Sequence, residues 1–152
     1  YDDPFDLIVA FDVVEHIKED RESLIALRRS LRPDGSILIT VPAVPFLWSR
    51  HDETHHHYRR YTRKQLKSVL EEAGYDVEYM SYFNTMLFPL IAGIRVLKKC
   101  LRLDDHADDA MPPKRVNSIL HKVFSSERHW VGKLSMPFGV SLVVIAKNRV
   151  HA

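Results

Sequence analysis

The fold is decided by two stretches of sequence, FDLIVAFDVVEHI at residues 5–17 and LRPDGSILITVP at residues 31–42. Each contains an apolar run of strand length, and a segment long enough for a helix lies between the two runs. This order predicts two parallel, buried strands joined by a crossover helix. Ligands of such sheets bind at the carboxyl ends of the strands. One pocket is therefore expected beside Phe11, Asp12, Glu15 and His16, together with the loop that follows residue 41.

The rest of the chain continues this alternation of helix and strand. Residues 21–31 place Leu24, Leu27 and Leu31 on one face, which is typical of a crossover helix packed on a sheet. The sequence TRKQ at residues 62–65 has the form of a capping box, and Gly74 follows at the distance expected for the end of that helix. Residues 75–82 and 141–147 have the composition of two further strands.

Two long segments lack this alternation. Residues 42–61 have no convincing period, and a connection of this length in a small domain indicates a functional lid. Residues 83–139 form a predicted helical insertion. Its apolar run, residues 86–94, is interrupted by proline and glycine and is too short to span a bilayer, which takes about 20 residues. This run is expected to cover the substrate pocket, with an interfacial segment at a lipid surface as the alternative. An acidic connection follows at residues 104–113.

The chain resembles the fourth and fifth strands of class I S-adenosylmethionine-dependent methyltransferases in the two stretches quoted above. The resemblance extends through VPA at 41–43, LWSRHD at 47–52, HYRRY at 57–61 and PFGVSL at 137–142. It implies an α/β, Rossmann-like class I methyltransferase fold, with a mostly parallel sheet whose last strand, residues 140–148, inserts antiparallel between the two before it. It also implies S-adenosyl-L-methionine as cofactor and a small-molecule acceptor of the methyl group.

One feature of that family has no counterpart in this sequence. The family wraps the cofactor with a glycine-rich loop, whereas the five glycines here, at 35, 74, 93, 132 and 139, form no Gly-x-Gly. We therefore expect the chain to be the C-terminal portion of a methyltransferase domain, not competent by itself. The expected organisation is one partial domain over 1–152, with core elements in 1–82, the lid at 42–61, the helical insertion at 83–139 and the final strand at 140–148.

Composition limits the partners and the compartment. A net charge of +2 and a pI near 8.7 are too mild to indicate a nucleic-acid binder. The single cysteine, Cys100, permits no internal disulfide, which favours a reducing compartment and a cytoplasmic location.

Candidate site residues follow from the chemistry of methyl transfer, which depends mainly on alignment of the two partners. A hydroxyl acceptor needs a base, and histidine suits that task at neutral pH, so His57 and His16 are the catalytic candidates, in that order. A structural role for His16 remains an equal alternative. The resemblance implies that part of the cofactor pocket wall is formed by Ala10, Phe11, Asp12 and His16. The residues expected at the acceptor, where guanidinium groups would hold an anion, are Trp48, His51, Arg59, Arg60 and Tyr61.

A metal site is the less favoured interpretation of the same residues. Asp12, Glu15 and His16 are spaced D-x-x-E-H, similar to the set proposed to hold a divalent ion in ubiquinone-biosynthesis O-methyltransferases. The histidines at 51 and 55–57 also suggest zinc, but adjacent side chains diverge and no cysteine joins them. No metal is expected.

Two functions from other classes remain open. A non-catalytic binding or assembly module would use an exposed sheet edge to pair with a second copy. A peripheral membrane module would use residues 83–102. The favoured function is methyl transfer to an anionic or lipid-linked small molecule.

Overall fold

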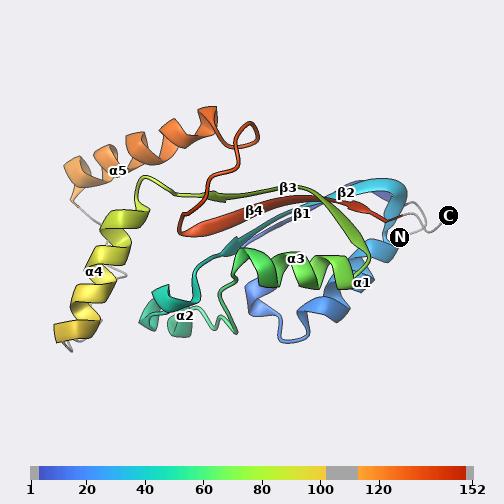
Figure 1. Ribbon diagram of the computed structural model, residues 1–152, viewed down its shortest axis with the longest axis horizontal. Helices are drawn as coiled ribbons and strands as arrows, with labels where there is room; N and C mark the ends of the chain where they lie inside the picture. The colour runs from blue at the N-terminus through green and yellow to red at the C-terminus, as the bar shows by residue number, and fades with distance from the viewer. Residues whose placement is uncertain (1–3, 102–112, 150–152) are drawn as a thin grey trace.

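The computed structural model describes residues 4–101 and 113–149. The strands and α-helices follow one another as β1 (Phe5–Phe11), α1 (Asp20–Arg29), β2 (Leu31–Pro42), α2 (Arg50–Thr54), α3 (Arg63–Glu72), β3 (Tyr75–Phe83), α4 (Phe88–Leu101), α5 (Lys114–Ser126) and β4 (Ser141–Asn148). Single 3-10 turns occur at η1 (Val14–His16), η2 (Pro45–Leu47) and η3 (Glu127–His129). The predicted α/β class is confirmed, with one four-stranded sheet at the centre (Figure 1).

The order of strands in the sheet is β1-β2-β4-β3. β1 and β2 are parallel, as predicted, and β4 is antiparallel to both of its neighbours. The final strand therefore inserts between the two before it, which confirms the expectation from the family resemblance. The Pro33-Asp34-Gly35 turn lies inside β2, where the pairing with β1 shifts between Phe5 and Leu7.

The hydrophobic core lies between the sheet and the helices α1 and α3, which Figure 1 shows on the same side of the sheet. Fully buried side chains come from alternate positions of β2 and from the inward faces of the helices, among them Ile37, Ile39, Val41, Leu24, Leu66 and Leu70. α1 ends at Arg29, so the prediction that the helix continues to residue 31 is wrong. Leu31 instead opens β2, because its backbone already pairs with Phe5.

α3 has the boundaries that the capping box predicts. The Thr62 hydroxyl accepts a hydrogen bond from the Gln65 backbone N–H, and the Gln65 side chain accepts one from the Thr62 N–H. Gly74 follows the helix at φ +88°, a backbone conformation that L side chains rarely adopt. The helix is thus fixed at both ends by the residues identified from the sequence.

β1 is the edge strand on one side of the sheet, and its side chains alternate between two environments. Ala10 is buried toward the helices, whereas Leu7, Val9 and Phe11 are about half exposed, at 52%, 46% and 56%. The pairing of Val9 with Leu38 continues this apolar row onto β2. One face of the sheet is therefore apolar and only partly covered at its β1 edge.

The segment between β3 and β4 contains the helices α4 and α5. Figure 1 shows both helices beyond the end of the sheet at which β3 finishes. None of the helices in the described ranges has the length and hydropathy that crossing a bilayer requires. Most of the acidic connection, residues 102–112, lies outside the described residues.

Candidate active site

A cavity of about 420 Å³ lies at the carboxyl ends of β1 and β2. Asp12 follows β1, Pro42 ends β2, and both border this cavity, as the parallel arrangement predicts. The other lining residues are Glu15, His16, His51, His55, His57, Arg60, Arg95, Val140 and Ser141. Eight of the eleven lining residues carry an ionisable side chain, so titratable groups from several parts of the chain meet at this cavity.

The end of β1 holds the residues expected at the cofactor. Asp12 has φ +50°, and its backbone N–H donates to the Thr40 carbonyl at 3.0 Å. The Thr40 hydroxyl donates in turn to the Asp12 carboxylate at 3.2 Å, which fixes this side chain against β2. Phe11 is exposed at the strand tip, whereas the Ala10 side chain is buried in the core. Only the backbone of Ala10 is therefore available to a ligand.

The segment predicted as a lid is a closed loop with helical turns. Its two ends meet, because the Tyr61 N–H donates to the Pro42 carbonyl and the Val44 N–H donates to the Tyr61 carbonyl, each at 3.0 Å. Between them lie η2 and α2. Both are too short to produce a hydrophobic periodicity in the sequence, which is why none was visible in residues 42–61. A further bond, from the Tyr58 N–H to the Glu15 carbonyl at 2.8 Å, attaches the loop to the turn after β1.

Asp52 holds this loop together from inside. Its side chain is fully buried and accepts hydrogen bonds from Arg60 Nε at 2.7 Å and from the Ser49 backbone N–H at 2.9 Å. Burial alone would raise the pKa of Asp52. The hydrogen bond and charge of Arg60, assisted by His57 and Ser49, outweigh burial and lower the pKa below its ordinary value. Asp52 is therefore a carboxylate at neutral pH.

His57 is oriented by this carboxylate. Its Nδ1 lies 2.9 Å from Asp52 Oδ1, and because an ionised carboxylate can only accept, Nδ1 carries the proton and Nε2 is left as the acceptor. Burial lowers the pKa of His57, and the hydrogen bond to Asp52 only partly opposes that effect. The imidazole is thus neutral near pH 7. The ring of His16 stands edge-on to it, with centroids 4.6 Å apart, so the structure brings the two predicted catalytic histidines together.

Glu15 lies close to these two rings. It is fully buried, and neither carboxylate oxygen has a hydrogen-bond partner among the described residues. Burial is the main cause that raises its pKa from 4.5 to about 7, with the charge of Asp12 adding to it against a backbone hydrogen bond. One ligand atom each from Glu15, His16 and His57 lies within 4.8 Å of the others, and we call these residues the Glu–His–His cluster. Its donor atoms suit a divalent transition metal. The D-x-x-E-H pattern of the sequence suggested Asp12 as the third ligand, whereas the structure brings His57 to that position.

The remaining histidines divide between two sides of the loop. His51 lies on α2 and His55 directly follows that helix; their ring centroids are 4.3 Å apart, and both residues border the main cavity. His56, at φ +56°, borders a neighbouring cavity of about 440 Å³ together with Glu53, His16 and His57. Adjacent histidines therefore diverge, as the sequence analysis expected.

The predicted clamp for an anionic acceptor does not form as one group. Arg59 pairs with Asp20 at 2.7 Å, and the buried hydroxyl of Tyr61 donates to the same carboxylate at 2.7 Å. These two residues attach the loop to α1 and lie outside the lining of the cavity. Arg60 borders the cavity but donates to Asp52. Trp48 is partly exposed, and its indole N–H lies 3.4 Å from Glu53.

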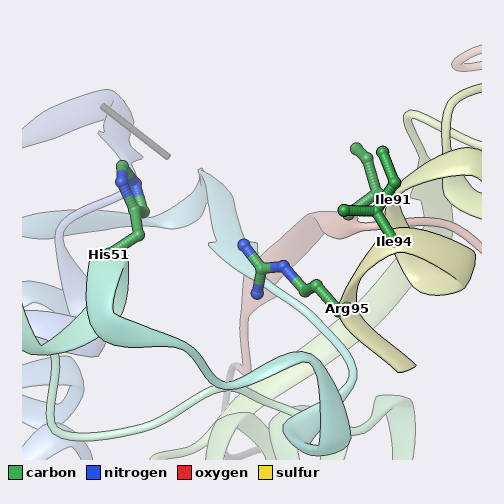
Figure 2. Close-up of a pocket in the computed structure, with 4 residues that line it drawn as sticks. All are labelled: His51, Ile91, Ile94 and Arg95. Carbon is green, nitrogen blue, oxygen red and sulfur yellow. The ribbon is translucent and has the colours of Figure 1, made fainter. Parts of the chain in front are cut away.

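Arg95 supplies a second arginine that the sequence analysis did not place at the site. It comes from α4, borders the main cavity, and lies 3.9 Å from Asp52. It also borders a cavity of about 260 Å³ with His51, Ile91 and Ile94. Figure 2 shows its guanidinium group between His51 of α2 and the two isoleucines of α4. The sequence offered one indication of this position, because residues 86–94, just before Arg95, were expected to cover the pocket.

Three comparisons relate the chain to known proteins. A family model described as a methyltransferase domain matches residues 1–79, just over half of the chain. No curated protein matches the chain significantly. Solved structures do match over nearly its whole length, at low sequence identity.

Three of these structures show what the chain is similar to. Phosphoethanolamine N-methyltransferase 2 of Haemonchus contortus, in complex with S-adenosyl-L-methionine, is 17% identical with a TM-score of 0.54. A putative methyltransferase of Bacillus halodurans is 15% identical with a TM-score of 0.56, and an S-adenosylmethionine-dependent methyltransferase of Mesorhizobium loti is 12% identical with a TM-score of 0.54. The matches cover 96%, 97% and 95% of this chain but 34%, 66% and 62% of those chains. This chain thus spans from about a third to two thirds of their length.

Proposed function

The chain belongs to the methyltransferase-domain family, and from this premise we propose that it forms the acceptor side of an S-adenosylmethionine-dependent methyl-transfer site. One observation carries the proposal. The carboxyl ends of β1 and β2 border a single cavity, and the Asp52–His57 pair lies in its wall. S-adenosylmethionine, when bound, supplies an electrophilic methyl group on a positively charged sulfonium. The residues of this chain would align an acceptor with it and take up a proton.

The residues at the tip of β1 fit a cationic cofactor. Phe11 presents an exposed aromatic ring, and Asp12 presents a carboxylate that Thr40 holds in place. A carboxylate and an aromatic face both attract positive charge. Asp12 and His16 border the main cavity, and Ala10 directly precedes Phe11 in β1. These four residues would form one wall of the cofactor site.

His57 is proposed as the general base for a hydroxyl acceptor. Its neutral imidazole accepts the proton at Nε2, and the buried Asp52 carboxylate then stabilises the imidazolium through Nδ1. Asp52 acts through His57 and is a positioning residue. His16, whose ring stands against that of His57, is the second candidate for the base.

The lining of the cavity favours an acceptor with an anionic group and an apolar part. Arg60 and Arg95 bring positive charge to the cavity. Beside it, Ile91 and Ile94 of α4 offer an apolar surface next to His51. An anionic, lipid-linked hydroxyl compound has both properties. The guanidinium of Arg95 would contact its anion and the two isoleucines its apolar portion.

The chain alone is proposed to lack catalytic competence, because its sequence contains no Gly-x-Gly to wrap the cofactor. Isothermal titration with S-adenosylhomocysteine tests this point. We expect no measurable heat with residues 1–152 and clear binding by a longer protein that contains them together with a glycine-rich loop. Tight binding by the chain itself would contradict the proposal.

The role of His57 is tested in such a longer protein by release of S-adenosylhomocysteine with a panel of hydroxyl acceptors. His57→Ala should lower kcat/KM by roughly 10²- to 10⁴-fold, the usual contribution of a general base. His129→Ala, on the exposed turn η3 outside the cavity, is the matched control and should leave the rate unchanged. In the wild type, kcat/KM should fall as the pH drops below the pKa of His57, which lies under 6.5. A rate that is insensitive to His57→Ala would remove histidine from the role of base.

A further inference from the structure

α4 carries an exposed apolar stripe. Leu90, Ile94, Leu97 and Leu101 recur at i, i+4, i+7 and i+11, which places them along one side of the helix. Their side chains are between 45% and 58% exposed. Helices of globular proteins normally turn such a stripe toward the core. Most of the stripe is left uncovered by the described part of the chain, so it is a candidate contact surface.

α5 repeats the pattern and is even less covered. It buries none of its residues, and Val116, Ile119 and Phe124 are 45%, 62% and 49% exposed. An isolated helix of this length is marginal in water, because its stability in proteins comes mostly from packing of an apolar face. α5 therefore needs a partner surface to be well populated.

The charges on the two helices define the kind of partner. Neither helix contains an aspartate or a glutamate. The basic residues in their sequences are Arg95, Lys98 and Lys99 in α4 and Lys114, Arg115 and Lys122 in α5. Glu127, directly after α5, is buried and accepts a hydrogen bond from the Met86 N–H. Arg95 lies beside Asp52 at the cavity, so the basic residues of α5 supply the positive charge of this surface. A basic, partly apolar surface is complementary to an anionic, partly apolar one.

We propose that α4 and α5 dock on an anionic membrane surface, with the apolar stripe of α4 and the exposed apolar residues of α5 in the headgroup region and Lys114, Arg115 and Lys122 near lipid phosphates. A second copy of the chain fits less well, because pairing these helices would bring positive charges together. Four aspartates in the sequence between the helices offset part of the attraction. Apolar insertion and basic charge are therefore both required.

This surface is also placed to serve the cavity. Ile91, Ile94 and Arg95 of α4 border a cavity (Figure 2), while the three leucines of the stripe, Leu90, Leu97 and Leu101, are exposed. A molecule bound in the membrane could therefore reach the cavity residues by moving along α4. The docking proposal does not depend on methyl transfer, because it concerns binding to lipid alone.

Sedimentation with vesicles tests the proposal on the complete 152-residue chain. Vesicles of phosphatidylcholine mixed with phosphatidylserine should pellet the wild type, and pure phosphatidylcholine vesicles should not. Raising the salt concentration should weaken binding, because exposed charges are screened. Leu97→Gln with Leu101→Gln should lower the partition coefficient at least tenfold. Lys122→Gln should lower it by about fivefold, the usual effect of one basic residue near an anionic surface.

Matched control variants distinguish binding through this surface from non-specific binding to vesicles. Leu7→Gln changes a leucine of similar exposure on β1, and Lys64→Gln removes a basic residue of α3, so neither should alter vesicle binding. Far-UV circular dichroism of each variant checks folding. Absence of binding, equal binding to pure phosphatidylcholine, or equal loss with the control variants would each overturn the proposal. So would a dimer in light scattering that Leu97→Gln dissociates, because a second copy would then cover the stripe.

Discussion

Replacing Glu15 with glutamine should make the protein more stable at alkaline pH and have little effect at acid pH. Glu15 is fully buried, its carboxylate oxygens accept no hydrogen bond within the described part of the chain, and burial raises its pKa from 4.5 to about 7. The folded state therefore binds this proton more tightly than the unfolded state. The contribution of the neutral carboxyl is fully present below pH 4.5 and is lost as the pH rises through about 7.

The size of the effect follows from the shift. A shift from 4.5 to about 7 corresponds to about 3 kcal/mol in the free energy of unfolding, at 1.36 kcal/mol for each pKa unit. Roughly 2.5 kcal/mol of this should appear between about pH 5 and about pH 8.5. Glutamine has the shape of the carboxylic acid and no charge, so the difference between variant and wild type should open over this interval.

Urea denaturation at the two pH values measures the difference directly. Glu22→Gln, an exposed carboxylate of α1, is the matched control, and its difference from wild type should stay nearly constant between the two conditions. The decisive quantity is the change in the Glu15→Gln difference with pH, because any fixed cost of burying the amide cancels. A difference that is the same at both pH values, or a variant that is less stable at alkaline pH, would refute the reasoning.

Three further predictions concern packing, metal binding and association. Gly139→Ala should destabilise the fold by about 1–3 kcal/mol, because a Cβ there would lie 2.3 Å from the Phe83 carbonyl oxygen, whereas Gly93→Ala in α4 has open space and should stabilise slightly in thermal melts. Zn²⁺ should occupy the Glu–His–His cluster and inhibit methyl transfer reversibly with EDTA; activation by Zn²⁺ would contradict a base role for His57. Exposed apolar residues on edge strand β1 should promote self-association, so Val9→Lys should shift light scattering toward the monomer, and an unchanged mass would exclude this edge.

The fold could be predicted from local sequence because its determinants are local. The apolar run after Phe5, the turn before Ser36 and the cap at Thr62 each specify an element through neighbouring residues, and the structure has all three elements. Helix boundaries were less accurate, since Leu31 continues the apolar face of α1 in sequence but pairs with Phe5 as strand. Tertiary pairing decided that boundary, and periodicity contains no information about it.

The site could be located but not assembled from the sequence. The ends of the predicted strands indicated where the site lies, and the titratable residues of 42–61 indicated which side chains it would contain. The partnership of Asp52 with His57 depends on the short helix α2, which residue spacing alone did not indicate. Arg95 reaches the cavity only because the insertion folds back toward α2, so its contribution is a tertiary effect.

Two buried carboxylates explain why the segment after α2 is a fixed wall of the cavity. His57 and Arg60 bind Asp52, and the next residues along, Arg59 and Tyr61, bind Asp20. The segment is therefore held from both sides, which fixes the ring of His57. Arg59 and Arg60, which were expected at the acceptor, form these ion pairs instead. A wall held in this way cannot open without breaking buried ion pairs. α4 borders the same cavity from the other side of Asp52, through Arg95, which lies 3.9 Å from that carboxylate.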